Sequence, residues 1–297
     1  MSRFEQKSGG AISSMDLKRP SVKLMYWLMF SVLMVLVCVC LLPPLWIFIS
    51  SMKSTEELYQ IPPTLFPKEF DLGKIAEVWK SLKFMRYYLN TTIVAGGAVV
   101  FSIIVNGLAG YVISRLRPKG SKLYLNIMLW TMLLPNTLSL VPLFKTMIDF
   151  PVFGFNLTNT YWPMWLMCGC NAFYVLIFKG FFDGVPMALV EAAKLDGSGN
   201  LGIFFRIMIP LSMPIIGVAT IFTVIGVWGD FLLPYLMLTD KDAQTIMVRI
   251  FNIKNTSLYT LDVQLMSLVL SILPSVVIFL FFQRYIMQGF TLSGIKG

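Results

Sequence analysis

The sequence contains no histidine, and acidic and basic residues together make up only 13% of its 297 residues. Histidine is the commonest general base and metal ligand of proteins, and no nucleophile with a positioned base is visible in the pattern. A G-x-x-x-x-G-K-S/T phosphate loop is also missing, since neither Gly9-Gly10 nor Gly96-Gly97 is followed by the required lysine. These absences argue against an enzyme and against a nucleotide site in this chain.

The shortage of charge is matched by an excess of apolar residues, which form 57% of the chain and give a mean hydropathy of +0.74. Soluble domains carry about 25% charged residues, because a polar surface has to cover the core. Lipid is therefore the expected solvent. The net charge of +9 does not indicate a nucleic-acid partner, because the cations lie at the ends of apolar runs and not on one basic segment with interleaved aromatics.

The four cysteines are few and lie within apolar runs. They form two C-x-C pairs, Cys38 with Cys40 and Cys168 with Cys170, and this is not a common zinc spacing. We expect buried, reduced thiols that behave as small hydrophobic side chains, and no metal site.

Long apolar runs predict an all-α, polytopic membrane protein with about six transmembrane helices, because about 20 apolar residues cross a bilayer core. Continuous runs favour helices over the alternating strands of a barrel. The first run is too long for a signal-peptide core, so we expect it to be retained. The candidate spans are Leu24–Ile49, Leu89–Ile113, Leu123–Met147, Trp162–Phe182, Ile207–Leu238 and Leu265–Tyr285.

The distribution of lysine and arginine predicts that both termini are cytoplasmic. Five cations precede or open the first span, and Arg115, Arg117, Lys119 and Lys122 follow the second span with no acid among them. The expected organisation is a cytoplasmic segment over 1–23, a transmembrane domain over 24–288 and a cytoplasmic tail over 289–297. Several prolines interrupt the spans, which indicates a packed bundle that lines a path.

The cytoplasmic stretch between the fourth and fifth spans, about 183–206, has the pattern of a short helix. Pro186 suits a first helical turn, Asp183 or Gly184 could cap it, and Gly197 suits its end. A helix of about ten residues is unstable alone in water and needs a docking surface. That surface is either the protein's own bundle or a partner, which Ala192 and Ala193 would admit closely and Glu191 would contact with its charge.

The run Glu191-Ala192-Ala193, Gly197, Ile209-Pro210-Leu211 and Pro214 resembles the EAA motif of binding-protein-dependent ABC importer permeases. Other segments resemble the carbohydrate-uptake permeases of that group, in particular the smaller permease subunits of maltose-type importers. They are Met52–Leu58, Asn90-Thr91-Thr92, Ala109–Arg115, Pro135–Leu143 and the ending Gln283–Thr291 with Ser293–Gly297. The resemblance extends over nearly the whole chain from about residue 24.

This resemblance implies a type I importer permease that works beside a second, homologous permease, as a heterodimer, in the bacterial inner membrane. A cytoplasmic ATPase dimer would bind ATP and Mg²⁺, and an external solute-binding protein would deliver the carbohydrate; this chain would need no cofactor. The implied coupling residues are Pro186, Glu191, Ala192, Ala193, Leu195, Asp196 and Gly197. The tail Ser293, Gly294, Ile295, Lys296 and Gly297 would reach the ATPase. Ser198-Gly199-Asn200 is more polar and glycine-rich than the usual continuation.

Polar and aromatic residues within the spans are candidates for the substrate path. An acid inside a span is costly, so Asp230 either lines a wet path, or pairs with a partner subunit or lies near an interface. Trp228 and Tyr235 could present flat faces to sugar rings. Asn171 and Tyr174 form a second set, in which Asn171 either lines the path or bonds another helix.

Other functions stay open from the residues alone. An ABC permease for polyamine, phosphate or sulfate would also carry an EAA-type loop. A non-transporting scaffold and an ion-driven carrier are further alternatives, and the lack of a visible internal repeat disfavours the carrier.

Overall fold

The computed structural model describes residues 20–151 and 154–293, and the regular elements in these two ranges are all helices. The only β-type pairing among them is an isolated bridge between Phe150 and Phe155. The all-α prediction is therefore confirmed. The chain divides into two compact units, one up to Asp71 and one from Leu72 onward.

The first unit contains the first predicted span, which is helix α1 (Pro20–Ser51). Its hydropathy of 2.8 over a membrane-length window confirms a segment long and apolar enough to cross a bilayer. Pro43 and Pro44 lie inside this helix, where a proline removes a backbone donor that a soluble helix would need. Transmembrane helices tolerate such prolines.

After α1 the Met52–Leu58 segment folds into a compact loop around one carboxylate. Ser54 caps the short helix α2 (Thr55–Leu58), and Glu57 accepts hydrogen bonds from Thr64 Oγ1 (2.6 Å) and from the Lys68 amide (3.2 Å). The Thr64 bond holds the pKa of Glu57 below its ordinary value, against the effect of burial. Lys53 donates to the Thr64 carbonyl and lies 4.9 Å from the Trp46 ring centre.

The second unit begins with α3 (Gly73–Ser81) and then holds the second predicted span as one 33-residue helix, Phe84–Leu116. This span consists of α4 (Phe84–Phe101), α5 (Gly107–Tyr111) and two π-helical turns, η2 (Ser102–Asn106) and η3 (Val112–Leu116). It ends at Arg117, whose φ of 46° is left-handed. The prediction is confirmed, and the helix extends beyond both predicted ends.

The third predicted span, Leu123–Met147, is wrong as a continuous helix. It is divided into α6 (Ser121–Met132), a 3-10 turn η4 (Asn136–Ser139) and α7 (Leu140–Ile148). Pro135 lies in the interruption, and proline disfavours helical geometry at the residue before it and donates no backbone hydrogen bond. Neither piece alone has the length of a span.

The fourth and fifth predicted spans are bent. Helices α8 (Trp162–Gly169) and α9 (Ala172–Gly184) meet at 43°. The segment formed by α11 (Asn200–Ile203), η5 (Phe204–Met208) and α12 (Ile209–Leu211) meets α13 (Met213–Gly229) at 81°, and α14 (Leu232–Met237) follows. The bend falls between Pro210 and Pro214, so the fifth span starts near Met213 and not at Ile207.

The sixth predicted span lies within α16 (Leu261–Ser293). It is preceded by α15 (Ile246–Lys254), a helix outside the predicted spans. Within the described ranges three helices can cross a membrane by length and composition, or five if each bent pair counts as one span. The expected six is reached only if the interrupted third segment is also threaded through the bilayer.

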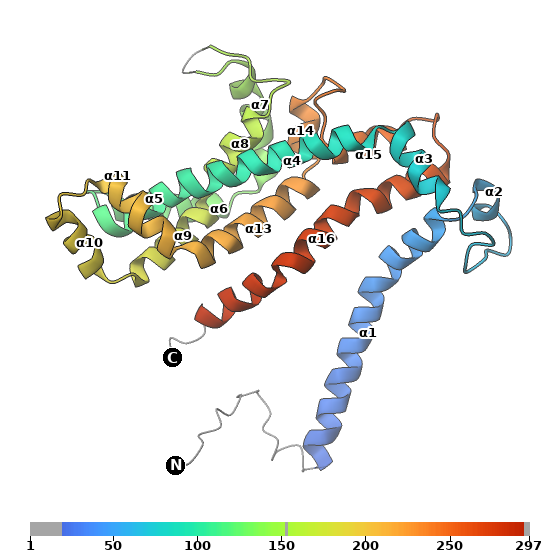
Figure 1. The fold of residues 1–297 in the computed structure, drawn as a ribbon, viewed down its shortest axis with the longest axis horizontal. Coiled ribbons are helices and arrows are strands. Elements are labelled where there is room, and N and C mark those ends of the chain that lie inside the picture. Colours follow the sequence, from blue (N-terminus) through green and yellow to red (C-terminus); the bar gives the residue numbers. More distant parts are fainter. Residues whose placement is uncertain (1–19, 152–153, 294–297) are drawn as a thin grey trace. The chain divides into compact units, whose positions relative to one another are not determined.

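Two apolar clusters hold the second unit together at its two ends. One joins Tyr111, Phe178, Phe182 and Phe204 near α10 and α11, and the other joins Val94, Met164, Val227 and Met237 near α8 and α14. Figure 1 shows α10 and α11 at one end of this unit, beyond α5, and α15 beside α4 toward the other end.

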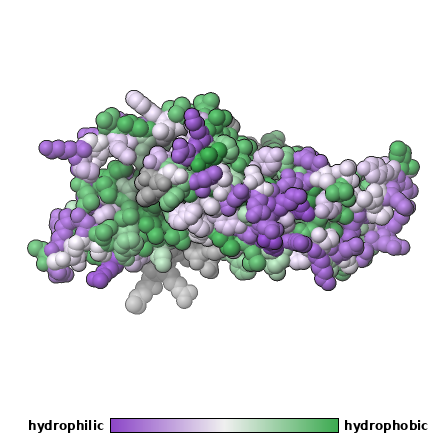
Figure 2. Space-filling model, turned by 90° about the horizontal axis from the view of Figure 1, so that it is seen from above, coloured by the Kyte–Doolittle hydropathy of each residue, from purple (hydrophilic) through white to green (hydrophobic). Residues whose placement is uncertain are grey.

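Large apolar side chains remain exposed along the helices that can span a membrane and along the interrupted third segment. Ile93 on α4, Trp130 on α6 and Phe281 on α16 are 51%, 69% and 72% exposed, and Figure 2 shows hydrophobic residues over wide areas of one face. Exposed apolar surface on this scale is expected where lipid or a partner subunit covers it.

Helices α5 and α9 approach closely at Gly110. A Cβ atom there would lie 2.9 Å from Phe178 Cβ and 3.0 Å from the Lys179 backbone nitrogen. Gly110→Ala should therefore lower the melting temperature of the detergent-solubilised protein, since overpacking costs about 1–3 kcal/mol. Gly96→Ala is the matched control because nothing lies within 4 Å of its Cβ position. Equal melting temperatures for the two variants would contradict the close packing.

Candidate functional site: an exposed short helix and a cavity at three helix breaks

The predicted short helix is α10 (Met187–Leu195), and its end has the expected glycine geometry. Gly197 has φ +82°, its amide donates to the Lys194 carbonyl (3.0 Å), and the Ser198 amide donates to the Ala193 carbonyl (2.9 Å). This is a Schellman end, which needs a left-handed residue after the helix. The sequence prediction of the stop is confirmed.

The predicted start of the helix needs correction. Asp183 and Gly184 do not cap α10, because they form the last turn of α9, and Pro186 occupies the cap position with an extended ψ of 131°. Asp183 instead accepts hydrogen bonds from Ser114 Oγ and Lys179 Nζ, each at 2.6 Å. Arg115 donates to the carbonyls of Phe182 and Val185. The end of the second span thus holds the connection into α10.

Helix α10 has one face on its own bundle and one face in solvent. Val190 (1% exposed) and Ala193 (7%) belong to the apolar cluster with Phe182 and Phe204, which supplies the docking surface that a nine-residue helix needs. Glu191, Ala192 and Asp196 are exposed, and Leu195 is 89% exposed. The helix therefore rests on its own bundle, and its outer face is exposed.

A cavity of about 790 Å³ lies within the second unit where three interrupted spans meet. Its lining includes both sides of the break in the third span, the break between α8 and α9, and the break between α13 and α14. Representative residues are Met132, Leu140, Cys168, Cys170, Asn171, Gly229 and Asp230. Irregular backbone at membrane depth is tolerated where it is buried in protein or lines a water-filled cavity, so this convergence marks a wet site.

The α8–α9 break is supported by Asn106 from η2, a residue that the sequence reading did not single out. The side-chain Nδ2 of Asn106 donates to the Cys168 carbonyl (2.8 Å), and its side-chain Oδ1 accepts from the backbone amide of Asn171 (3.0 Å). Asn171 Oδ1 in turn caps α9 by accepting from the amides of Phe173 (3.0 Å) and Tyr174 (3.4 Å). Asn106 is fully buried, and a polar residue within an apolar span was the signal that could have identified it.

Of the five predicted path residues, the structure brings three together at the cavity: Asn171, Tyr174 and Asp230. Asp230 ends α13, where its amide donates to the Val227 carbonyl (3.3 Å). Asn171 caps α9 with its side chain and lines the cavity, and Asp230 lines the cavity at the break after α13.

The other two predicted path residues lie elsewhere. Trp228 is 4% exposed, and its Nε1 donates to the Ser271 carbonyl (3.1 Å). Tyr235 packs its ring 5.0 Å from Phe231 and 5.2 Å from Phe251. Neither lines the cavity, because the turn at Asp230 redirects the chain and places the flanking aromatic rings in other contacts.

The cysteines depart from the expectation of burial. All four are free, as expected, but Cys38, Cys40 and Cys170 are exposed and Cys168 is half-buried. Cys168 and Cys170 line the cavity at the α8–α9 break. Their exposure follows from that break, which the apolar composition of the span did not reveal.

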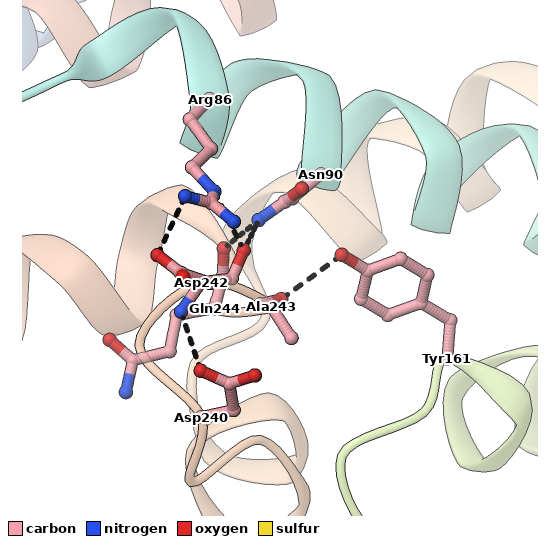
Figure 3. A network of polar contacts seen from close by, with 7 residues as sticks. All are labelled: Arg86, Asn90, Tyr161, Asp240, Asp242, Ala243 and Gln244. Atoms are coloured by element: carbon pink, nitrogen blue, oxygen red, sulfur yellow. Dashed lines mark hydrogen bonds and ion pairs between the residues drawn. The ribbon is translucent and has the colours of Figure 1, made fainter.

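At the opposite end of the unit, a polar network fixes the loop after α14 to α4 and to the start of α8 (Figure 3). Arg86 pairs with Asp242 at 2.7 Å, and Asn90 Nδ2 donates to the carbonyls of Asp242 (2.8 Å) and Gln244 (2.9 Å). The Tyr161 hydroxyl donates to the Ala243 carbonyl (3.2 Å). The Asn90-Thr91-Thr92 segment thus holds this loop in a defined position.

The predicted C-terminal contact segment is only partly described. Ser293 is the last residue of α16, and Gly294, Ile295, Lys296 and Gly297 lie outside the described residues. The same is true of residues 1–19, which make up most of the predicted N-terminal segment.

A helical membrane transport protein is defined by three features: the interrupted spans, the cavity that they line and the exposed helix α10. A model of one family, described as the inner membrane component of binding-protein-dependent transport systems, matches residues 98–291. This is well over half of the chain, and the chain belongs to that family. It is therefore a membrane-spanning permease component and not an enzyme.

Individual relatives cover almost the whole chain. It is 29% identical over 252 residues to the diacetylchitobiose uptake system permease protein NgcG of Streptomyces coelicolor, a match that covers 84% of this chain and 82% of that protein. It is 27% identical over 284 residues to the arabinooligosaccharides transport system permease protein AraQ of Halalkalibacterium halodurans, which covers 95% and 100%.

The fold is also found in a solved structure. A chain of a bacterial ABC transporter involved in the import of the acidic polysaccharide alginate matches with a TM-score of 0.78 and 22% identity, over 90% of this chain and 98% of that one. This likeness confirms the importer-permease fold.

Replacement of Asn106 tests the support of the α8–α9 break. Asn106→Ala leaves the Cys168 carbonyl and the Asn171 amide without their partner, so the free energy of unfolding in detergent should fall by about 1–3 kcal/mol. Asn126→Ala is the control, because the Asn126 side chain is exposed and makes no hydrogen bond with the described residues. If both variants melt at the same temperature, the break does not depend on Asn106.

Proposed function

We propose that this chain is one of two permease subunits of an ATP-driven importer for an oligosaccharide or another carbohydrate. The observation that carries the proposal is the cavity of about 790 Å³ at three helix breaks, on a chain whose cytoplasmic-type helix α10 exposes an apolar residue, Leu195. The relatives NgcG and AraQ support the carbohydrate assignment, since their names describe uptake of sugar oligomers.

The lining of the cavity suits an uncharged, hydroxylated cargo. Its polar side chains include Thr131, Asn171, Tyr174 and Thr223, with Asp230 as the single carboxylate and no lysine or arginine. Hydroxyl, amide and carboxylate groups bond to sugar hydroxyls, and the rings of Phe173 and Tyr174 offer flat apolar faces. A second, homologous permease would complete the path in a heterodimer, and an external solute-binding protein would deliver the sugar.

Coupling would pass through the outer face of α10. In this proposal Pro186 starts the helix, Glu191, Ala192, Leu195 and Asp196 contact a cytoplasmic ATPase dimer, and Gly197 shapes the end. Ala193 would act from inside, because it packs on the bundle. ATP and Mg²⁺ would bind to the ATPase, and this chain would hold neither.

The same proposal sets the topology. Arg115, Arg117, Lys119 and Lys122 would be cytoplasmic together with α10, and both termini would lie on that side, with 1–23 and 289–297 as the flanking segments. The loop held by Arg86 and Asn90 would be external. Its rigid attachment to α4 and α8 suits a surface that receives the binding protein.

Reversal of one charge tests the coupling assignment. Glu191→Lys should lower the affinity of the permease pair for the ATPase by about tenfold or more, since mismatched charges at an interface cost several kcal/mol. Substrate-stimulated ATP hydrolysis in proteoliposomes should fall in parallel. Glu69→Lys is the control, because Glu69 is exposed and belongs to the first unit.

A second variant separates contact from helix geometry. Gly197→Val places a β-branched residue at φ +82°, although nothing lies within 4 Å of the added Cβ. Substrate-stimulated hydrolysis should again fall, and the protein should still insert into the membrane. The melting temperature should fall modestly, since a non-glycine residue at positive φ costs about 1–3 kcal/mol. Normal uptake by both Glu191→Lys and Gly197→Val would remove α10 from the coupling route.

Removal of the cavity's single charge tests the cargo assignment. Asp230→Asn keeps the size of the side chain and removes its charge. The half-saturating sugar concentration for transport should rise, by about fivefold to tenfold if one charge-assisted hydrogen bond is lost. An unchanged concentration dependence would contradict a contact between Asp230 and the sugar.

A further inference from the structure

A second cavity, of about 550 Å³, lies where the turn after the second span meets α6 and α9. Its lining combines two kinds of residue. Arg117, Lys122 and Lys179 are cationic, against one carboxylate, Asp183, while Ile113, Pro118 and Leu125 are apolar. The cavity is thus amphipathic, with an excess of positive charge.

The three cations differ in how far they are already neutralised. Lys179 is paired with Asp183 at 2.6 Å. Arg117 uses its Nε to donate to the Ser114 carbonyl (2.8 Å) and has no carboxylate within ion-pair distance among the described residues. Lys122 is exposed and makes no hydrogen bond or ion pair in those ranges. Two positive charges therefore remain available at the rim of the cavity.

The backbone adds to this positive potential. The cavity is also lined by Gly120 and Ser121, which start the twelve-residue helix α6, and no acid lies in the first turn of that helix. The N-terminus of a helix carries a partial positive charge that an anion can balance. Lysines and arginines that only set the membrane topology do not need to line a cavity. Here the cations line a cavity whose wall is also apolar.

We propose that this cavity binds the phosphate headgroup of an anionic phospholipid at the membrane surface. The phosphate would lie between Arg117 and Lys122 near the start of α6, and the first carbons of the acyl chains would follow Ile113 and Leu125. Basic pockets beside transmembrane helices on the cytoplasmic side are the places where anionic headgroups bind. The proposal is independent of which solute is transported.

Native mass spectrometry of the full chain in detergent can test this site with phosphatidylglycerol and phosphatidylcholine of the same acyl composition. Phosphatidylglycerol should be retained preferentially. Lys122→Gln should weaken its binding about fivefold, the effect expected for one surface cation near an anionic lipid, and leave phosphatidylcholine unchanged. Arg117→Gln should act in the same direction.

Lys254→Gln is the matched control, because Lys254 is exposed at the end of α15, far along the chain from the cavity. The comparison uses only variants whose melting temperature equals that of the unmodified protein. Equal retention of the two lipids, or equal effects of Lys122→Gln and Lys254→Gln, would overturn the proposal.

Two further outcomes would reassign the site. Displacement of phosphatidylglycerol by millimolar glycerol 1-phosphate would overturn the lipid assignment in favour of a soluble phosphate compound. Unchanged lipid retention in Lys122→Gln, with weaker co-purification of the cytoplasmic ATPase, would overturn it in favour of a protein contact.

Discussion

The structure depends on one constraint: inside a bilayer, a backbone amide or carbonyl freed by a helix break needs a protein partner or water. This chain interrupts its third, fourth and fifth apolar segments and places the three interruptions around one cavity. Asn106 and Asn171 bond freed backbone groups at the α8–α9 break. The other freed backbone groups at the breaks face the cavity. The breaks therefore account both for the hydrogen bonds that stabilise the bundle and for the polar lining of the cavity.

The same polar residues therefore serve two purposes. Asn171 caps α9 while lining the cavity, and Asp230 ends α13 while contributing the only carboxylate among the described lining residues. A polar group that is already oriented by backbone amides needs less reordering when a ligand binds. In a transport path this allows weak contacts that are preorganised and still release their cargo.

Packed contacts tie α10 to the second and fourth spans. Gly110 lets α5 lie against the backbone of α9, and Arg115 and Ser114 hold the last turn of α9 and the chain entering α10. Val190 and Ala193 then fix α10 on the apolar cluster of Phe182 and Phe204. A displacement of α10 would consequently be carried into the second and fourth spans as a unit, because close-packed interiors transmit strain.

The sequence by itself determined the helical class, the first, second and sixth spans, and the end of α10 at Gly197, because length, hydropathy and the left-handed preference of glycine act locally. It also singled out Asn171, Tyr174 and Asp230, three residues that line the cavity. Only the tertiary structure decided that Trp228 and Tyr235 leave the cavity, that Ala193 turns inward, that the third segment is broken and that Asn106 supports a break 62 residues away. These outcomes depend on which freed backbone groups form hydrogen bonds with distant helices, and the local sequence does not specify those bonds.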